Sequence, residues 1–269
     1  MSLELFQDAQ RIVVKVGTST LTHDTGKLHI RRIEGLVRVL SDLKNEGREI
    51  ILVSSGAIGV GVGKMGLVRR PSDPAGRQAL AAVGQCELMF MYDKLFSEYG
   101  HVVAQVLLTR FDVDNAERKH NVINTFSRLL DLGALPIVNE NDTVAIDELV
   151  GNNFGDNDTL SAIVAKIVDA DALVLLTDID GLYTDDPHKN PQAQRIDVVH
   201  TIDDSVRKLA KGRGSSRGTG GMVTKIAAAQ IAMDAGIPCA IVLGEKPHRL
   251  YHLFEGTQTG TVFLPSGVE

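Results

Sequence analysis

Lys15 is a charged residue at a position where the sequence otherwise predicts a buried strand. It lies near the end of the apolar run 12–16, and the Gly17-Thr18-Ser19 sequence that follows is typical of a tight turn with free backbone N–H groups. Burying an ammonium group costs several kcal/mol unless it meets an anion, so this lysine indicates a bound phosphate or carboxylate. The alternative is a lysine whose ammonium group reaches solvent from a strand end, and this stretch alone leaves both interpretations open.

A second lysine, Lys225, follows a glycine-rich segment in the C-terminal part of the chain. Residues 211–221 are rich in Gly, Ser and Thr, and they lead into a helix predicted over 226–235. One interpretation of such a segment is a flexible loop. In the other, a glycine-rich loop that opens a helix binds phosphate through free N–H groups and the helix dipole. Because Lys225 repeats the combination seen at Lys15, the pattern favours phosphate binding.

Amide and carboxylate side chains follow other predicted strands. Residues 139–142 (Asn-Glu-Asn-Asp) follow the short strand 135–138, and Thr177 and Asp178 follow the strand 173–176. Asp156, Asn157 and Asp158 precede a predicted helix over 159–168, where an N-cap would explain only one of the three. Two lysines, glycine turns and these polar groups, without a His or Cys in a nucleophilic setting, indicate phosphoryl transfer, which needs fixed cations and N–H donors.

The elements around these residues predict an α/β fold with a parallel sheet. The strand 12–16, a helix from residue 30 that Gly47 ends, and the strand 49–53 form a βαβ unit. Its right-handed crossover places both glycine turns, at Gly17 and Gly56, on one edge of the sheet. The pattern continues with helices over 76–99, 117–132 and 203–210 and strands over 101–108, 237–243 and 257–263, and residues 143–153 are expected to form an exposed hairpin or lid.

Residues 57–70 contain two misleading motifs. Gly61-Val-Gly-Lys-Met-Gly66 matches the dinucleotide-binding fingerprint, but it does not directly follow a strand. Gly63-Lys64 resembles the end of a P-loop, but Met65 stands where a hydroxyl must bind magnesium. The glycines are therefore expected to permit close helix packing or to form a mobile surface loop.

Composition excludes several classes of protein. The chain has 269 residues, 43% of them hydrophobic and 23% charged, with a net charge of −6 and no basic patch typical of nucleic-acid binding. Cys86 and Cys239 form no CxxC pattern, and buried thiols in a reducing compartment are expected. No apolar run approaches the roughly 18 residues of a membrane span, and no signal peptide is present, so a cytoplasmic protein without membrane contact is expected.

Six stretches in order resemble the amino acid kinase family: 13–19, 54–58, 139–142, 155–161, 177–183 and 218–225. The resemblance covers nearly all 269 residues, and the 139–142 and 155–161 stretches are specific to members that act on glutamate. It implies a three-layer α/β/α sandwich with a mainly parallel central sheet. The single domain, 1–269, would have an amino-acid-binding half over about 1–170 and a nucleotide-binding half over about 171–269, without the C-terminal PUA domain of many such kinases.

The resemblance also implies an activity: ATP and Mg²⁺ phosphorylate the γ-carboxylate of L-glutamate, the first step of proline biosynthesis. Lys15 and Lys225 would bracket the transferring phosphoryl group, with Asp158 between them and N–H groups from Gly17 and Gly56. Glutamate would contact Ser55, Asp142 and Asn157, with Asp142 pairing its ammonium group. ATP would contact Lys15, Thr177, Asp178, Thr219, Gly220, Gly221, Met222, Val223, Thr224 and Lys225. Magnesium would lie mainly on phosphates and water, so no residue is assigned to it.

Assembly and regulation follow from the same resemblance. Family members form dimers or tetramers, and the apolar helix segment 85–95 is the candidate contact. The region around 114–149 is the candidate for feedback inhibition by proline. The alternatives are a sister kinase acting on acetylglutamate, aspartate, carbamate or uridylate, a nicotinamide-dependent oxidoreductase based on residues 61–66, and a non-catalytic amino-acid sensor. Asp142 argues against an acetylated substrate, which has no ammonium group.

Overall fold

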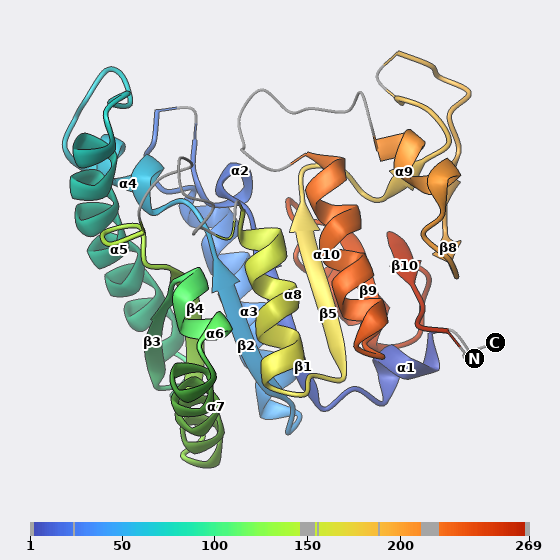
Figure 1. The fold of residues 1–269 in the computed structure, drawn as a ribbon, viewed down its shortest axis with the longest axis horizontal. Coiled ribbons are helices and arrows are strands. Elements are labelled where there is room, and N and C mark those ends of the chain that lie inside the picture. Colours follow the sequence, from blue (N-terminus) through green and yellow to red (C-terminus); the bar gives the residue numbers. More distant parts are fainter. Residues whose placement is uncertain are drawn as a thin grey trace.

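The computed structural model describes residues 3–23, 25–145, 154, 156–187, 189–210 and 221–266. Within these residues, eight strands form one sheet in the order β3-β4-β2-β1-β5-β9-β10-β8 (Figure 1). The strands are β1 (Arg11–Val16), β2 (Glu49–Ser54), β3 (Val103–Leu108), β4 (Leu135–Glu140), β5 (Ala172–Thr177), β8 (Val198–Val199), β9 (Cys239–Leu243) and β10 (Thr261–Phe263). Two further strands, β6 (Leu182–Tyr183) and β7 (Arg195–Ile196), pair with each other in antiparallel fashion.

The sheet is mainly parallel, as the sequence predicts. β1 pairs in parallel with both β2 and β5, and β3, β4 and β9 continue the same direction. β10 reverses it, since β10 pairs antiparallel with β9, and β8 then follows β10. β10 is also shorter than the terminal strand predicted over 257–263. The sequence does not indicate its reversed direction.

Helices cover both faces of the sheet and complete the three layers (Figure 1). Two separate hydrophobic clusters show which helices belong to each face. One face carries α1 (Glu4–Gln7), α3 (Ile30–Asn45), α4 (Ala57–Lys64), α5 (Pro74–Ser97) and α11 (Arg249–Phe254). The other carries α6 (Arg110–Asp114), α7 (Ala116–Asp131), α8 (Asn157–Ile167), α9 (Asp204–Ala210) and α10 (Met222–Asp234), while the one-turn helix α2 (Thr18–Leu21) follows β1. The α/β/α sandwich is confirmed.

Alternation along β1 decides which layer Lys15 faces. Val14 and Val16 pack in the cluster formed with α3 and α5, whereas Val13 packs in the cluster formed with α8 and α10. Successive side chains of a strand point to opposite faces, so Lys15 shares the face of Val13. The lysine therefore points toward α8 and α10.

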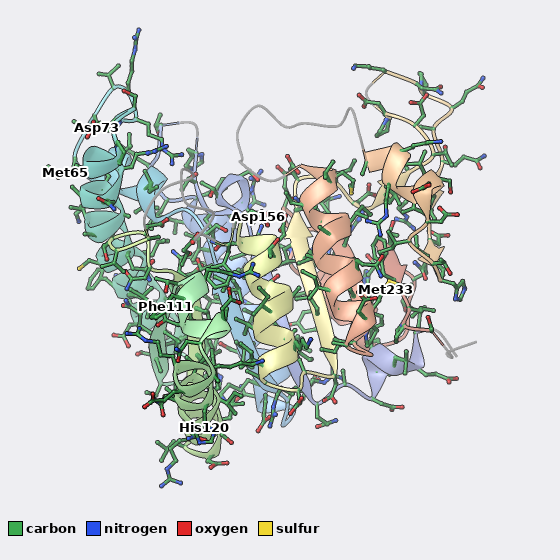
Figure 2. All side chains as sticks on the ribbon, in the orientation of Figure 1. Met65, Asp73, Phe111, His120, Asp156 and Met233 are labelled. Carbon is green, nitrogen blue, oxygen red and sulfur yellow. The ribbon has the colours of Figure 1, made fainter. Side chains whose placement is uncertain are left out.

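The order of the strands places a switch point at β1. The chain leaves β1 for β2 on one side, continues to β3 and β4, and returns to β5 on the other side of β1. In open α/β sheets, ligands bind beyond the carboxyl ends of the strands at such a point. In Figure 2, Asp156 lies at this end of the molecule, at the start of α8, whereas His120 on α7 lies at the opposite end.

The glycines of 57–64 form no dinucleotide-binding turn, and Gly61 serves close helix packing. They lie inside α4, which packs against α5. A Cβ at Gly61 would lie 2.0 Å from the carbonyl oxygen of Leu80, and a Cβ at Gly84 would lie 1.7 Å from that of Ala57. Only glycine permits this approach of the two helix backbones. Residues 61–66 thus lack the strand-to-helix turn that an oxidoreductase fingerprint requires.

One expectation about the cysteines is wrong. Cys239 is buried in β9, as expected, but Cys86 is exposed on α5 because it lies on the side of that helix away from the sheet. Within the described part of the chain, no helix is both long enough and apolar enough to cross a membrane.

Candidate active site

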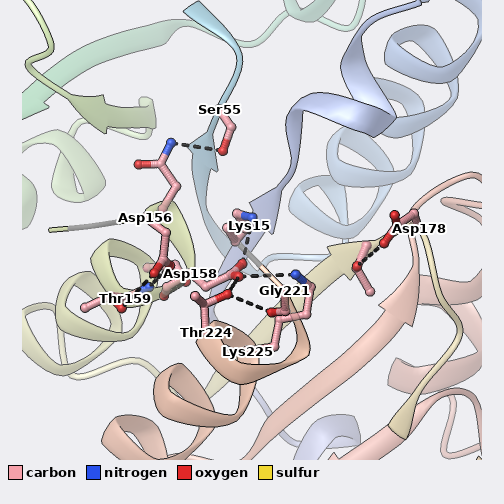
Figure 3. A network of polar contacts seen from close by, with 12 residues as sticks. Lys15, Ser55, Asp156, Asp158, Thr159, Asp178, Gly221, Thr224 and Lys225 are labelled. Atoms are coloured by element: carbon pink, nitrogen blue, oxygen red, sulfur yellow. Dashed lines mark hydrogen bonds and ion pairs between the residues drawn. The ribbon is translucent and has the colours of Figure 1, made fainter. Parts of the chain in front are cut away.

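The side chains of Lys15 and Lys225 meet at one carboxylate (Figure 3). Lys15 Nζ lies 2.6 Å from Oδ1 of Asp158, and Lys225 Nζ lies 3.2 Å from Oδ2. The three residues come from β1, α10 and α8, and they are only 7%, 6% and 1% exposed, respectively. The structure therefore brings together the two lysines and the aspartate that the sequence singled out, and neither lysine points to bulk solvent.

The environment of Asp158 keeps its carboxylate charged. Burial alone would raise the pKa of Asp158, but the charges of Lys15 and Lys225 and a hydrogen bond from Thr224 outweigh it and hold the pKa below its ordinary value. The centre then has two ammonium groups and one carboxylate. Its net positive charge suits a strongly anionic group such as a triphosphate.

Thr224 contacts this centre in a way that the sequence does not indicate. Its hydroxyl lies 2.8 Å from Asp158 Oδ2 and 2.8 Å from the carbonyl oxygen of Gly221. A hydroxyl has one hydrogen, so it donates to one of the two acceptors at a time. The contact with Asp158 depends on how α10 packs against α8, which no local motif reports.

Two glycine turns lie side by side next to the lysines. Gly56 has a φ of +97°, a left-handed conformation that glycine adopts without strain. A Cβ at Gly56 would lie 3.5 Å from the side chain of Thr18, and one at Gly17 would lie 3.6 Å from Lys15 Nζ. The prediction that both turns share one edge is confirmed, and the absence of side chains leaves room around the Lys15 ammonium group.

Asn157, the first residue of α8, fixes the polarity of the neighbouring subsite. Its Nδ2 lies 2.9 Å from Ser55 Oγ, 2.9 Å from Asn139 Oδ1 and 3.0 Å from the carbonyl oxygen of Ser54. All three are acceptors, so the amide NH₂ group of Asn157 points toward them. Among the described residues, none donates to Asn157 Oδ1, and the Ser55 hydroxyl keeps its own hydrogen. Asn157 therefore offers this subsite one acceptor, and Ser55 offers it one donor.

Three carboxylates give this subsite a preference for a cation. Burial raises the pKa of Glu140, Asp142 and Asp156. The charges of Asp142 and Asp156 raise the pKa of Glu140 further, whereas the charge of Arg70 opposes the increase at Asp142. The sequence predicts Asp142 at this subsite, and the structure adds the carboxylates of Glu140 and Asp156. Across the described residues, no three His, Cys, Asp or Glu side chains are arranged to hold a metal ion.

The ends of β5 and β9 form the other side of the site. Thr177 is buried, and its hydroxyl donates to Asp178 Oδ1 at 3.0 Å. Its carbonyl oxygen accepts from the N–H of Gly244 at 2.7 Å, which ties the two strand ends together. Asp178 itself is exposed. Both predicted residues therefore lie at the carboxyl edge of the sheet.

The predicted nucleotide loop is only partly described. Gly221 is the N-cap of α10, and Val223 is 52% exposed. The side chain of Met222 packs in the hydrophobic core, so this residue faces the site only through its backbone. Thr219 and Gly220 lie outside the described residues, as does most of the predicted hairpin at 143–153.

Fixed cations and glycine turns at the switch point of an α/β sheet define a site for phosphoryl transfer. The side chains that contact the Asp158 carboxylate in the described part of the chain are those of Lys15, Lys225 and Thr224. Burial and the charge of Asp158 raise the pKa of the Cys239 thiol, which makes it a poor nucleophile. Residues 10–243 match the model of the amino acid kinase family. The chain belongs to that family.

Relatives with curated names cover nearly the whole chain. A glutamate 5-kinase of Clostridium perfringens is 53% identical over 259 residues, which are 96% of this chain and 96% of the relative. A glutamate 5-kinase of Symbiobacterium thermophilum is 52% identical over 98% of this chain and 99% of the relative.

Two solved structures share the fold at low sequence identity. A UMP kinase from Bacillus anthracis superposes with a TM-score of 0.65 at 15% identity, covering 96% of this chain and 97% of that one. An isopentenyl phosphate kinase from T. acidophilum has a TM-score of 0.61 at 18% identity, covering 94% and 99%. These likenesses support the fold and say nothing about the substrate.

Proposed function

We propose that the protein transfers the γ-phosphoryl group of ATP to the γ-carboxylate of L-glutamate, giving L-glutamyl 5-phosphate and ADP, the first step of proline biosynthesis. The observation that carries this proposal is the meeting of Lys15 and Lys225 at Asp158. Glutamate is supported as the substrate by the names of the relatives and by their sequence identity to this chain, which is about one half.

The transfer needs little covalent help from the protein. An oxygen of the γ-carboxylate attacks the γ-phosphorus, one P–O bond forms, and the bond to the bridging oxygen breaks with its electron pair leaving on ADP. Lys15 and Lys225 stabilise the charge on the moving phosphoryl group, and Gly17 and Gly56 supply N–H donors. Asp158 is the positioning residue that keeps two like charges aimed at one point. A carboxylate is already an anion, so no general base is required.

ATP occupies the side of the site formed by β5, β9 and α10, and a magnesium ion would accompany its phosphates. Thr177, Asp178 and the loop before Lys225 hold the nucleotide. Both oxygens of Asp158 face ammonium groups, so this carboxylate is a poor candidate for a metal ligand. Mg²⁺ would be held mainly by phosphate oxygens and water, as that ion prefers, and would supply partial neutralisation of the phosphate charge.

The amino-acid subsite matches the two charged groups on the α-carbon of glutamate. Asn157 Oδ1 and the carboxylate of Asp142 accept hydrogen bonds from the ammonium group, and the Ser55 hydroxyl donates to a carboxylate. An acetylated amino acid has no ammonium group and leaves Asp142 without a partner. This polarity favours glutamate over acetylglutamate.

The test is ADP release from MgATP with a panel of acids: glutamate, aspartate, acetylglutamate, carbamate and uridylate. Hydroxylamine converts an acyl phosphate into a hydroxamate, which identifies the acceptor as a carboxyl group. We expect glutamate to give both ADP and hydroxamate with the highest kcat/KM. Faster turnover of another acceptor would assign a sister activity, and no turnover of any acceptor would leave a non-catalytic sensor.

Assembly, regulation and location complete the proposal. The chain forms a homo-oligomer through the outer face of α5, where Phe90 is 61% exposed. Proline inhibits the enzyme through the region around 114–149, of which residues 146–149 lie outside the described part of the chain. The enzyme acts in the cytoplasm, with an amino-acid half up to about residue 170. Light scattering of Phe90→Glu and a proline titration of the hydroxamate assay test the first two points.

A further inference from the structure

Two buried polar side chains of α5 have no place in the proposed reaction. Gln85 is 8% exposed and Tyr92 is 1% exposed, and both lie in the part of α5 that faces the sheet. A buried polar group is costly unless it has a hydrogen-bond partner. Gln85 Oε1 accepts from Asn139 Nδ2 at 2.9 Å, and the Tyr92 hydroxyl lies 2.9 Å from Ser54 Oγ.

Both partners of these side chains lie at strand ends that support Asn157. Asn139 is near the end of β4 and Ser54 is the last residue of β2. Asn157 Nδ2 lies 2.9 Å from Asn139 Oδ1 and 3.0 Å from the carbonyl oxygen of Ser54. A chain of hydrogen bonds therefore passes from the α5 layer, over the edge of the sheet, to the start of α8 in the opposite layer.

The direction of these bonds is fixed by the number of donors and acceptors. Asn139 Oδ1 also accepts from the N–H of Glu140 at 2.9 Å, while its NH₂ group donates to Gln85. If the Asn139 amide were reversed, its NH₂ group would face two other donors and its oxygen would face the oxygen of Gln85. Gln85 thus helps to keep the Asn139 oxygen aimed at Asn157.

We propose that Gln85 and Tyr92 are positioning residues of the amino-acid subsite. Acting through Asn139 and Ser54, they hold Asn157 with its carbonyl oxygen toward the substrate ammonium group. The inference rests on the proposed function, because that ammonium group belongs to glutamate. Neither α5 side chain touches the substrate, so their loss weakens glutamate binding and spares nucleotide binding.

Steady-state kinetics of three variants test the inference. Gln85→Met keeps the shape of the side chain but removes the acceptor, leaving the buried NH₂ group of Asn139 unpaired. We expect its glutamate KM to rise about tenfold, with kcat and MgATP KM within about twofold of the wild type. Gln85→Glu keeps an acceptor oxygen and should stay within about threefold. Tyr92→Phe should raise glutamate KM about threefold, because Ser54 Oγ retains a 3.4 Å contact with the carbonyl oxygen of Ser55.

The control is Cys86→Ser, because Cys86 is an exposed neighbour of Gln85 on α5. The kinetic constants of this variant should match those of the wild type. A merely structural role of Gln85 would change the glutamate and MgATP KM values together. An unchanged glutamate KM in Gln85→Met, or equal damage in Gln85→Glu, would overturn the inference. A wild type that forms no hydroxamate with glutamate would instead refute the proposed function, so the two failures are distinct.

Discussion

The charged centre and the amide network fix the polar groups of the candidate site by different physical means. At Asp158, the ammonium groups of Lys15 and Lys225 act on one carboxylate, and electrostatic attraction between buried charges falls off slowly with distance. At Asn157, neutral hydrogen bonds to Ser55 and Asn139 hold an amide, and such bonds weaken steeply as their angle changes. The first region depends on charge, and the second depends on geometry.

This difference predicts which kinetic constant each region controls. In the proposed reaction, the charges at Asp158 act on a phosphoryl group whose charge distribution changes during transfer, so they should affect kcat. The amide of Asn157 is proposed to contact a substrate group that does not react, so it should affect glutamate KM. Substitutions of equal size in the two regions can separate these effects.

The largest effect is expected for Asp158→Asn, which removes one charge without changing shape. Two buried ammonium groups then repel each other without a carboxylate between them, and we expect kcat to fall about a thousandfold. Because the variant breaks a buried ion pair, it should also lose about 3–5 kcal/mol of stability. Hydroxamate kinetics and thermal unfolding measure the two effects.

Asp234→Asn is the matched control for that variant, since it removes an exposed carboxylate from α10. It should leave kcat and Tm unchanged. If Asp158→Asn retained more than a tenth of the wild-type kcat, the charged centre would not organise the transfer, and the contrast between the two regions would fail.

Lys225→Ala tests one of the two cations. Its ammonium group should contact the phosphoryl oxygens more strongly in the transition state, so kcat should fall by about two to three orders of magnitude while glutamate KM changes far less. Lys225→Arg keeps the charge in a planar, larger group and should recover little activity. An unchanged kcat in Lys225→Ala would remove its catalytic assignment, and exposed Lys166→Ala is the control.

The same contrast explains how much the sequence predicts. Lys15 and Lys225 stand out because a lysine is unusual at a buried strand end or in the first turn of a helix. Asp158 stands out because an N-cap explains only one of the three polar residues 156–158. The alternation along β1 decides the face of Lys15. Gln85 is different, since its partner Asn139 is 54 positions away and α5 shows only an apolar pattern in sequence.

Elements with a regular pattern are predicted well, and relations between distant elements are not. The helix at 30–45 and the strand at 49–54 agree closely with the hydrophobic spacing. The reversed direction of β10 and the exposure of Cys86 depend on how whole elements pack, and neither has a local sequence signal. The amide orientation of Asn157 is of the same kind, because it depends on three separate segments.

Asp142→Asn should weaken glutamate binding without slowing transfer. The variant removes the carboxylate that we propose as the acceptor for the substrate ammonium group, and we expect glutamate KM to rise about a hundredfold with kcat within a few-fold. Burial raises the pKa of Asp142, so its charged form destabilises the folded protein at neutral pH. The variant should therefore have a slightly higher Tm, and a lower Tm together with an unchanged KM would contradict the assignment.

The pH dependence of glutamate KM follows from the same carboxylates. The pKa values of Asp142, Glu140 and Asp156 are raised by burial, and Arg70 opposes the increase only at Asp142. As the pH falls through these raised values, the groups take up protons and lose their attraction for an ammonium group. As the pH is lowered, glutamate KM should thus begin to rise at a pH above the ordinary pKa range of aspartate. The rise should be smaller in Asp142→Asn. A pH-independent KM in the wild type would argue against these carboxylates.

The smallest effect on kcat is expected for Thr224, whose neutral hydroxyl contacts the charged centre. Thr224→Val keeps the shape of the side chain but removes its bond to Asp158, and we expect kcat to fall about tenfold because one of several contacts on a charged group is lost. Thr224→Ser restores the hydroxyl and should recover most of the rate. Since Lys225 still holds Asp158 in Thr224→Val, glutamate KM should not change. A selective rise in glutamate KM would show that the charged centre and the amide network are coupled through α8, and the separation of their roles would then be wrong.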